Sequence, residues 1–494
     1  MTALEGSPAA TSSGPDVAPL REPGLPLWLR LVLPGVAIAV VVIKMLRPIS
    51  DPDTLWHIRA GELLLETGQF VQRDPWSATQ TKPWVLHQWL PEAVMALLNG
   101  AFGLPGVAWG ATAAVAVLGL AVWIVLRKQA GLLITALILT VTVAGMSASL
   151  SPRPQIVSFV LTIISVHVWL ASAHDARPRW WLIGLSWLWA CSHGLWILGP
   201  LLGLVVIVGM ALEGAQPRGV LARLSIVPIG SLAVGLLTPV GPQLVRSFTD
   251  VRQVAPLLHE WQPTPPTHPA FIAVAILVAL PLLLNLRSTR RMGWVHILLL
   301  GSAAVFALLY GRTVAVAAAI AAPLAASALQ QATRLKRERM GSVEKAITPL
   351  MVSATLAVTA IAAPAVASEP AQVPVGLNPA LRALPSGTII CNQDAIGGWL
   401  TWEHPNVRPT LDTRMEIYGA EHVSAYAKFL SAQPGWAEYV DKTHCSAALL
   451  KTDTAVIEAL RTSLHWREIG RSGEYALLIG PEPAMSCAED QSDT

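Results

Sequence analysis

The sequence contains little charge. Asp, Glu, Lys and Arg make up only 13% of the 494 residues, whereas hydrophobic residues make up 53%. Soluble globular proteins carry about 25% charged residues, so this composition excludes that class and predicts a polytopic membrane protein. The formal net charge is only +3, and the basic residues are scattered in short groups between apolar runs. This distribution does not indicate a nucleic-acid partner.

Cysteine is also scarce. The four cysteines, which are Cys191, Cys391, Cys445 and Cys487, form neither a CxxC pair nor the spacing of a zinc site. Cys391 and Cys445 fall in the same hydrophilic segment near the C-terminus. A disulfide between them stays open at this point, because it requires that the segment lie in an oxidising compartment.

Apolar runs are what the chain does contain, and about 20 apolar residues suffice for a transmembrane helix. Eleven runs are present, at residues 26–46, 107–126, 132–150, 156–173, 180–192, 195–212, 224–240, 270–286, 294–309, 314–329 and 347–366. The first run ends in KMLRP without an A-x-A cleavage site, so we expect an uncleaved helix rather than a signal peptide.

The Lys and Arg residues between the runs predict the topology. All basic groups fall on one side of the membrane, as the positive-inside rule requires, if the block 180–212 breaks near Ser192-His193-Gly194 into two helices. We therefore expect about eleven transmembrane helices, with the N-terminus inside and the C-terminus outside. A second interpretation of the two short halves is a re-entrant pair shielded by protein.

Composition divides the chain into four regions. We expect a disordered cytoplasmic tail at 1–24, a transmembrane domain at 25–368 with outer loops at 47–106 and 241–269, a small extracytoplasmic α/β domain at 369–481, and a disordered tail at 482–494. Within the α/β domain we expect strands at 388–393 and 446–452, helices at 420–430 and 454–463, and a hairpin around Ser472-Gly473.

The first outer loop contains two carboxylates in an unusual place. Asp51 and Asp53 follow the first apolar run by about one helical turn, where anions lose solvation and usually have a task. Such a carboxylate can act as a general base toward an acceptor hydroxyl, or hold a divalent cation that neutralises a leaving phosphate. The competing interpretation is helix capping, with Asp53 or Thr54 as the N-cap of a helix at 55–66. Capping accounts less well for Asp51.

Aromatic, histidine and arginine side chains accompany the carboxylates. Trp and His favour membrane interfaces, but they also suit a sugar ligand, and the sequence does not separate these uses. We expect an interfacial helix from Trp84 to Phe102. His57, His87, His193 and His259 show no metal-ligand spacing. Arg153 and Arg312 lie on the outer side, against the charge bias, which indicates an anionic ligand such as phosphate, with lipid head groups as the alternative.

The first outer loop also resembles a known family. The segment DPDTLWHIRAGELLLETGQF with the following DPWS, and the segment KPW-x-x-x-x-WL before the second span, resemble the first outer loop of GT-C superfamily membrane glycosyltransferases. That superfamily includes protein mannosyltransferases and lipid A aminoarabinose transferases. A closer resemblance is to uncharacterised bacterial membrane proteins with a D-x-D-x-W-W-H pattern. Looser matches lie at Arg153-Pro154-Gln155, Trp189 to Gly199, Gly397 to Trp402 and Asp412 to Gly419. The departures are Leu55 for Trp, Gln88 for Glu and Cys191 for Asn.

The resemblance implies a bacterial cytoplasmic membrane, a GT-C-like fold and transfer of a sugar from a polyprenyl-phosphate-sugar donor to an extracytoplasmic glycan, lipid or protein. It implies Asp53, and next Asp51, as the catalytic base. It requires no cofactor, and a divalent cation is the one candidate. Our candidates for substrate binding are Trp56, His57, Asp74, Lys82, His87, Arg153, His193, Glu260 and Arg312. The alternative function is a non-enzymatic envelope protein that binds a glycan or an assembly partner. A transporter predicts internal repeats and polar residues at mid-membrane depth, which we do not find.

Overall fold

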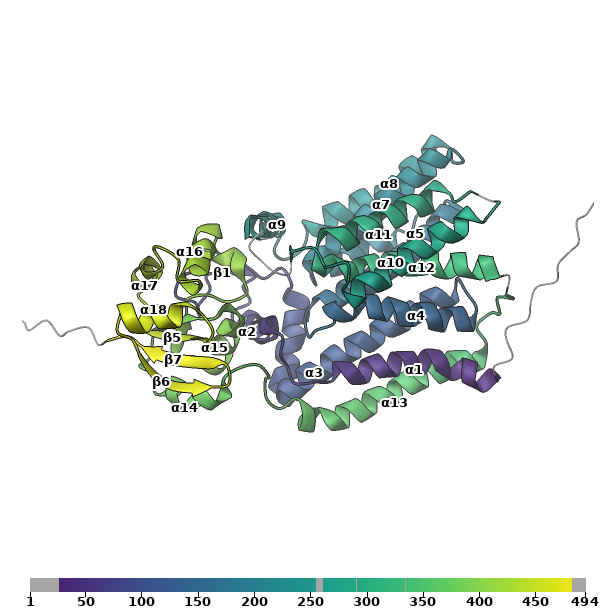
Figure 1. Ribbon diagram of the computed structural model, residues 1–494. Coiled ribbons are helices and arrows are strands. Elements are labelled where there is room, and N and C mark those ends of the chain that lie inside the picture. Colours follow the sequence, from purple (N-terminus) through teal and green to yellow (C-terminus); the bar gives the residue numbers. More distant parts are fainter. Residues whose placement is uncertain (1–25, 255–260, 290, 334, 482–494) are drawn as a thin grey trace, which may run out of the picture.

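The computed structural model of the protein describes residues 26–254, 261–289, 291–333 and 335–481. The tails expected at 1–24 and 482–494 lie outside the described residues. A bundle of long helices carries a small domain with a β-sheet at one end, which we call the domain end of the bundle (Figure 1). Helices α2 and α9 lie between the bundle and this domain.

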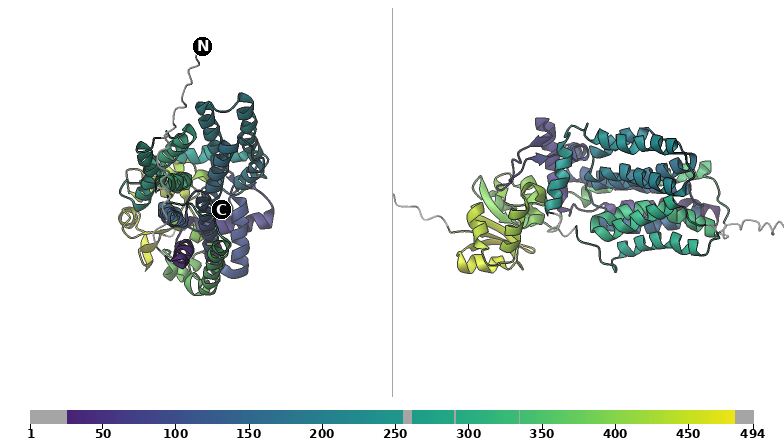
Figure 2. Two further views of the ribbon diagram at one scale, coloured as in Figure 1. Left: turned by 90° about the vertical axis from the view of Figure 1, so that its right-hand side faces the viewer. Right: turned by 90° about the horizontal axis from the view of Figure 1, so that it is seen from above.

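Within the described residues, the bundle consists of eleven apolar helices that correspond to the eleven predicted runs. They are α1 (Leu27–Met45), α3 (Trp89–Arg127), α4 (Leu132–Met146), α5 (Gln155–Asp175), α6 (Trp181–Ala190), α7 (Leu198–Glu213), α8 (Arg218–Gly235), α10 (Pro269–Leu286), α11 (Trp294–Leu309), α12 (Val314–Thr333) and α13 (Ser342–Val366). Among the described residues, nine helices are long and apolar enough to cross a membrane, while α6 and α11 are shorter. The helices run roughly parallel to one another (Figure 2).

The predicted break in the block 180–212 is confirmed. Helix α6 ends at Ala190, His193 has an extended backbone, and a short 3-10 helix, η2 (Gly194–Ile197), leads into α7. At the centre of the bundle, every residue of α12 from 314 to 326 is buried, and most of them are alanines. Small side chains let neighbouring helices approach closely in a membrane, and α12 packs against α4, α10 and α11.

The first loop forms a helix and a short hairpin. Helix α2 (Pro52–Thr67) is followed by β1 (Val71–Gln72) and β2 (Trp84–Val85), which pair antiparallel. The helix expected from Trp84 therefore begins only at Trp89, because residues 84 and 85 belong to this hairpin. Helix α3 then continues through a kink at Gly103, whose φ of 65° is the left-handed region that favours glycine.

The C-terminal domain is a five-stranded mixed sheet with helices. The sheet order is β4-β3-β5-β7-β6, with β3 parallel to β4 and β5, and β7 antiparallel to β5 and β6. The strands are β3 (Thr388–Asn392), β4 (Val407–Pro409), β5 (Ala447–Lys451), β6 (Arg467–Ser472) and β7 (Tyr475–Ile479). The helices are α14 (Asn378–Arg382), α15 (Asp394–Glu403), α16 (Ala420–Leu430), α17 (Ala437–Thr443) and α18 (Val456–Ser463).

The strands, helices and hairpin expected in this domain are confirmed at their predicted places. Cys391 and Cys445, whose pairing the sequence left open, form a disulfide that links the region of β3 to the start of β5. In the second expected outer loop, helix α9 (Gln243–Val254) packs against the short 3-10 helix η7 (Met415–Ile417) of the C-terminal domain. The domain therefore contacts the bundle through α2, α9 and the first loop.

Candidate functional site

The two aspartates of the first loop meet an arginine from the segment before α5. Nε of Arg153 donates to both carboxylate oxygens of Asp51 at 2.7 Å, and its Nη1 lies 2.9 Å from Oδ2 of Asp53. The side chains of Arg153, Asp51 and Asp53 are 10%, 11% and 14% exposed. One guanidinium group thus holds both carboxylates.

Asp51 also caps helix α2. One of its carboxylate oxygens accepts a hydrogen bond of 2.9 Å from the backbone N–H of Asp53. The expectation that Asp53 or Thr54 caps this helix is wrong. Pro52 occupies the first helical position, where its fixed φ and missing N–H are well tolerated. The cap is therefore the residue before it, Asp51, which lies two residues before Asp53.

Asp53 lies inside a network of donors. The Thr413 hydroxyl from the C-terminal domain donates to Oδ1 of Asp53, and Nε1 of Trp56 donates to the same oxygen at 3.3 Å. Burial, the largest influence, raises the pKa of Asp53, but Arg153, His57, the Thr413 hydrogen bond and Arg312 together hold it below its ordinary value. Asp53 is therefore an ionised carboxylate, stabilised by protein hydrogen bonds and an ion pair rather than by solvent, that joins the bundle to the domain.

His57 forms a buried pair with a carboxylate that the sequence did not single out. Its Nδ1 lies 2.9 Å from Oε1 of Glu92, in the first turn of α3, and both side chains are 3% exposed. Oε2 of Glu92 is buried without a hydrogen-bond partner. The sequence feature that could have indicated Glu92 is Gln88, which stands where the resembling pattern has Glu. Glu92 lies one helical turn after Gln88, and its N–H donates to the Gln88 carbonyl at 3.3 Å.

The remaining cations and histidines of the prediction gather around this pair. His57, Glu92 and Arg312 all act electrostatically on His87, although burial is the main reason why the pKa of His87 is lowered. Burial is the main reason why the pKa of His193 lies well below its ordinary value, and Arg312, His87, His57 and Arg153 act in the same direction. The structure thus brings together eight of the predicted residues, namely Asp51, Asp53, Trp56, His57, His87, Arg153, His193 and Arg312.

Asp74 lies in a second, fully buried cluster. Nη1 of Arg414 is 3.0 Å from Oδ1 of Asp74, Nε of Arg414 donates to Asp412 at 3.0 Å, and the Arg414 guanidinium lies 4.4 Å from the Trp84 ring centroid. Burial raises the pKa of Asp74, but Arg414 and two hydrogen bonds from Ser77 outweigh it and lower the pKa. Asp74 therefore joins the first loop to the C-terminal domain.

Lys82 and Glu260 complete the predicted set. Nζ of Lys82 donates to the Gln253 side chain of α9 at 3.2 Å, in an exposed position. Glu260 lies outside the described residues. Within the ranges that the structure describes, no group of three or more His, Cys, Asp or Glu side chains is arranged to hold a metal ion. A divalent cation stays a prediction.

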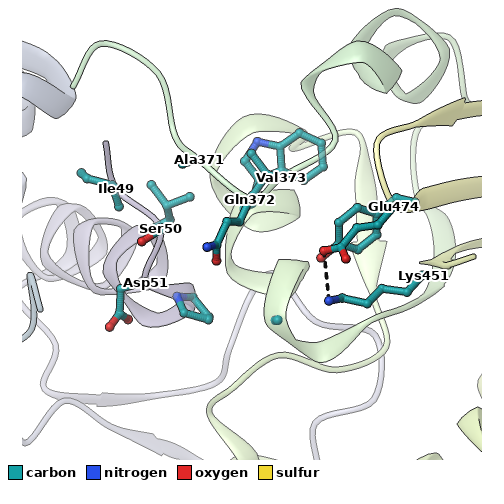
Figure 3. A pocket seen from close by; sticks show the side chains of 13 residues that line it. Ile49, Ser50, Asp51, Ala371, Gln372, Val373, Lys451 and Glu474 are labelled. Atoms are coloured by element: carbon teal, nitrogen blue, oxygen red, sulfur yellow. Dashed lines mark ion pairs between the residues drawn. The ribbon is translucent and has the colours of Figure 1, made fainter. Parts of the chain in front are cut away.

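A pocket of about 80 Å³ opens next to the start of α2 (Figure 3). Asp51, Gln372 and Trp399 are among the residues that line it, and a salt bridge of 3.0 Å between Lys451 and Glu474 closes one side. Because a buried water needs about 10–15 Å³ of such space, the pocket has room for several waters. It lies between the first loop and the C-terminal domain.

Together, the helical bundle, the loop site and the terminal sheet domain define a multi-pass membrane protein of GT-C-like fold. Solved structures of an oligosaccharyltransferase share this fold. The Archaeoglobus fulgidus oligosaccharyltransferase in the apo form matches with a TM-score of 0.58 and 12% identity, over 86% of this chain and 70% of that chain. The same oligosaccharyltransferase tethered with an acceptor peptide matches with a TM-score of 0.54 and 12% identity, over 86% and 69%. At this identity the similarity shows the fold alone. No family model and no curated protein matches.

Proposed function

We propose that the chain is a membrane glycosyltransferase that moves a sugar from a polyprenyl-phosphate-sugar donor to an acceptor outside a bacterial cytoplasmic membrane. The acceptor is a glycan, lipid or protein of the cell envelope. The Cys391–Cys445 disulfide supports an extracytoplasmic position of the C-terminal domain, because disulfides persist in oxidising compartments. The membrane lipid surrounds the bundle, and the N-terminus lies inside.

The observation that carries this proposal is the Asp51–Arg153–Asp53 cluster at the domain end of a GT-C-like fold. A guanidinium group suits a leaving phosphate because it offers several fixed donors and a permanent charge. Arg312 acts electrostatically on the same cluster, so two cations are available for the negative charge that develops on the phosphate. The two carboxylates keep Arg153 in place and orient the acceptor.

The test replaces Asp51 and Asp53 with Asn, singly and together, in the full-length protein. We expect the double variant to lose sugar transfer by about 10²-fold or more, because preorganised charges at a transferring group contribute this much. The measurement follows label from heptaprenyl-phosphate-linked hexoses into envelope fractions. Asp175→Asn, which alters an exposed salt bridge with Arg179 in another part of the bundle, is the matched control. Full transfer by a folded double variant contradicts the proposal.

A second candidate function is a non-enzymatic envelope protein that binds a glycan or an assembly partner. The capping bond from Asp51 to the N–H of Asp53 favours it, since it gives Asp51 a structural role without chemistry. If this function is correct, the protein turns over no lipid-linked donor. Glycan binding, measured by calorimetry, should then persist in the variant in which both Asp51 and Asp53 are replaced with Asn.

A further inference from the structure

We propose that His57, oriented by Glu92, is the base that removes the proton from a hydroxyl group of the acceptor. The inference rests on the proposed function, which supplies the sugar donor. It identifies the acceptor by class, as a hydroxyl-bearing molecule that reaches the junction between α2, α3 and the C-terminal domain. It also gives Glu92 a role as a positioning residue.

The contact between His57 and Glu92 orients the imidazole ring. Nδ1 of His57 lies 2.9 Å from Oε1 of Glu92, so an ionised Glu92 holds the ring proton on Nδ1 and leaves the lone pair on Nε2. In the described part of the chain, Nε2 has no hydrogen-bond partner. Unlike Oε2 of Glu92, which is buried without a partner, Nε2 is not sealed off inside the described structure. Nε2 is therefore the nitrogen that can accept a proton.

The surroundings keep this pair rigid and dry. The rings of His57 and Trp56 have centroids 3.7 Å apart, which limits rotation of the imidazole. Glu92 is only 2% exposed, so little solvent weakens its attraction for a charge on the ring. Gly61 brings α2 against α3 so closely that a Cβ atom there would lie 2.0 Å from the Glu92 carbonyl oxygen. The backbones that carry the two side chains are thus in direct contact.

Asp53 is less suited to take the proton. Its carboxylate already accepts hydrogen bonds from Thr413 and Trp56 and pairs with Arg153. Burial raises the pKa of Asp53, but Arg153, His57, the Thr413 hydrogen bond and Arg312 together hold it below its ordinary value. A weakly basic carboxylate is a poor proton acceptor. Asp53 and His57 interact electrostatically, so Asp53 instead stabilises the imidazolium that forms on His57.

The transfer needs only the acceptor, the lipid-linked donor and His57. The acceptor O–H bond breaks, and its proton moves to Nε2 of His57. The oxygen keeps the electron pair and forms a bond with the anomeric carbon of the donor sugar. The bond from that carbon to the phosphate oxygen breaks, and polyprenyl phosphate leaves with the electron pair. Positive charge develops beside Glu92, and negative charge develops on the phosphate, which Arg153 and Arg312 are positioned to offset.

The first experiment removes the imidazole and adds it back. In the full-length protein, with heptaprenyl-phosphate-linked hexose as the probe, His57→Ala should lower transfer by about 10²- to 10⁴-fold, the usual contribution of a general base. Millimolar imidazole should raise the transfer rate of the His57→Ala variant by about tenfold or more, because the free base occupies the vacated space and accepts the proton. His174→Ala, at an exposed position near the end of α5, should change neither rate nor response to imidazole.

The second experiment tests the positioning role of Glu92. Glu92→Gln should lower kcat by about 10²-fold while the KM for the donor stays constant, because an amide no longer holds the ring in the productive tautomer. A purely structural role would instead lower the thermal stability and the donor affinity together with kcat. Glu66→Gln, on an exposed position of α2, is the matched control.

The outcomes separate this inference from the proposed function. A wild-type protein that transfers no sugar from the lipid-linked hexoses overturns both. An active wild type whose His57→Ala variant keeps its full rate overturns the inference alone. A folded His57→Ala variant whose lost activity imidazole does not restore also overturns it. Loss of activity with recovery by imidazole, together with a kcat effect in Glu92→Gln, supports it.

Discussion

Asp51 combines two roles in one side chain. Its carboxylate accepts a hydrogen bond from the N–H of Asp53 and a bifurcated one from the Nε–H of Arg153, which is shared between both oxygens. A helix N-terminus and a guanidinium group are both electropositive, so the two roles reinforce each other. This pairing is the physical reason why a carboxylate is maintained at a membrane boundary, where an unpaired anion is costly.

Glu416 is a half-buried carboxylate in η7 that lacks a salt bridge within the described residues. Burial raises its pKa from 4.5 to about 7, with Asp412 and Asp53 acting in the same direction and Arg414 opposing them. Between these two pH values the folded state binds more protons than the unfolded state. Glu416 therefore contributes stability below pH 4.5 that is lost as the pH rises through about 7.

We predict that Glu416→Gln makes the protein more stable than the wild type at pH 8, by at most about 3 kcal/mol, and changes its stability little at pH 5. The amide stays neutral, so the cost of ionising a buried group disappears. Thermal unfolding in detergent at both pH values measures the difference. Glu421→Gln, at an exposed position of α16, should show no such pH dependence. A difference of equal size at both pH values would contradict the prediction.

At the scale of elements, the crossing of α2 over α3 determines the site. Helix α2 carries Asp53 and His57, and α3 carries Glu92, so the distance between the helices decides whether His57 and Glu92 meet. Gly61 makes this approach possible, because a side chain there would overlap the backbone of α3. Helix propensity alone disfavours glycine in a helix, and the close packing explains its presence.

We predict that Gly61→Ala destabilises the protein by about 1–3 kcal/mol, the usual range for overpacking. It should also lower sugar transfer, since the helices must separate and the contact between His57 and Glu92 lengthens. Thermal unfolding and the transfer assay measure the two effects. In Gly100→Ala on α3, where the added methyl meets nothing within 4 Å, neither stability nor transfer should fall. Equal effects of the two substitutions would refute the close-packing explanation.

At the scale of the whole molecule, a loop from the membrane domain crosses into the C-terminal domain. Backbone hydrogen bonds of 3.0 Å join Ala78 to Pro409 and Thr81 to Ile417. Arg414 of the C-terminal domain is buried and pairs with Asp74 of this loop and with Asp412 of its own segment. The domain is therefore attached to the bundle by a buried ionic cluster as well as by its linker.

We predict that Arg414→Met destabilises the protein by about 3–5 kcal/mol, because it leaves two buried carboxylates without their cation. Loosened contact should also expose the first loop to proteases before the bundle unfolds. Thermal unfolding and limited proteolysis measure these effects. Arg471→Met, which removes an exposed pair with Glu468 in the terminal hairpin, should cost less than about 1 kcal/mol. Undiminished stability of Arg414→Met would show that the cluster does not attach the domain.

The eleven apolar runs, the break near His193 and the strands and helices of the C-terminal domain follow from the sequence by itself. Each depends on local hydrophobicity, on periodicity or on turn residues, which a short window of sequence contains. The sequence also indicated the residues near Asp53, because carboxylates and arginines at a membrane boundary are unusual wherever they occur.

Only the tertiary structure decided how these residues are used. Thr413 donates to Asp53 across 360 positions of the chain, and Arg414 reaches Asp74 across 340, distances over which local pattern carries no information. Helix α3 begins at Trp89 rather than at Trp84, because residues 84 and 85 pair in a hairpin. Arg153, about 100 positions away in the chain, pairs with the Asp51 carboxylate that caps α2. The pairing of His57 with Glu92 depends on the close crossing of two helices, which is a property of packing rather than of either segment.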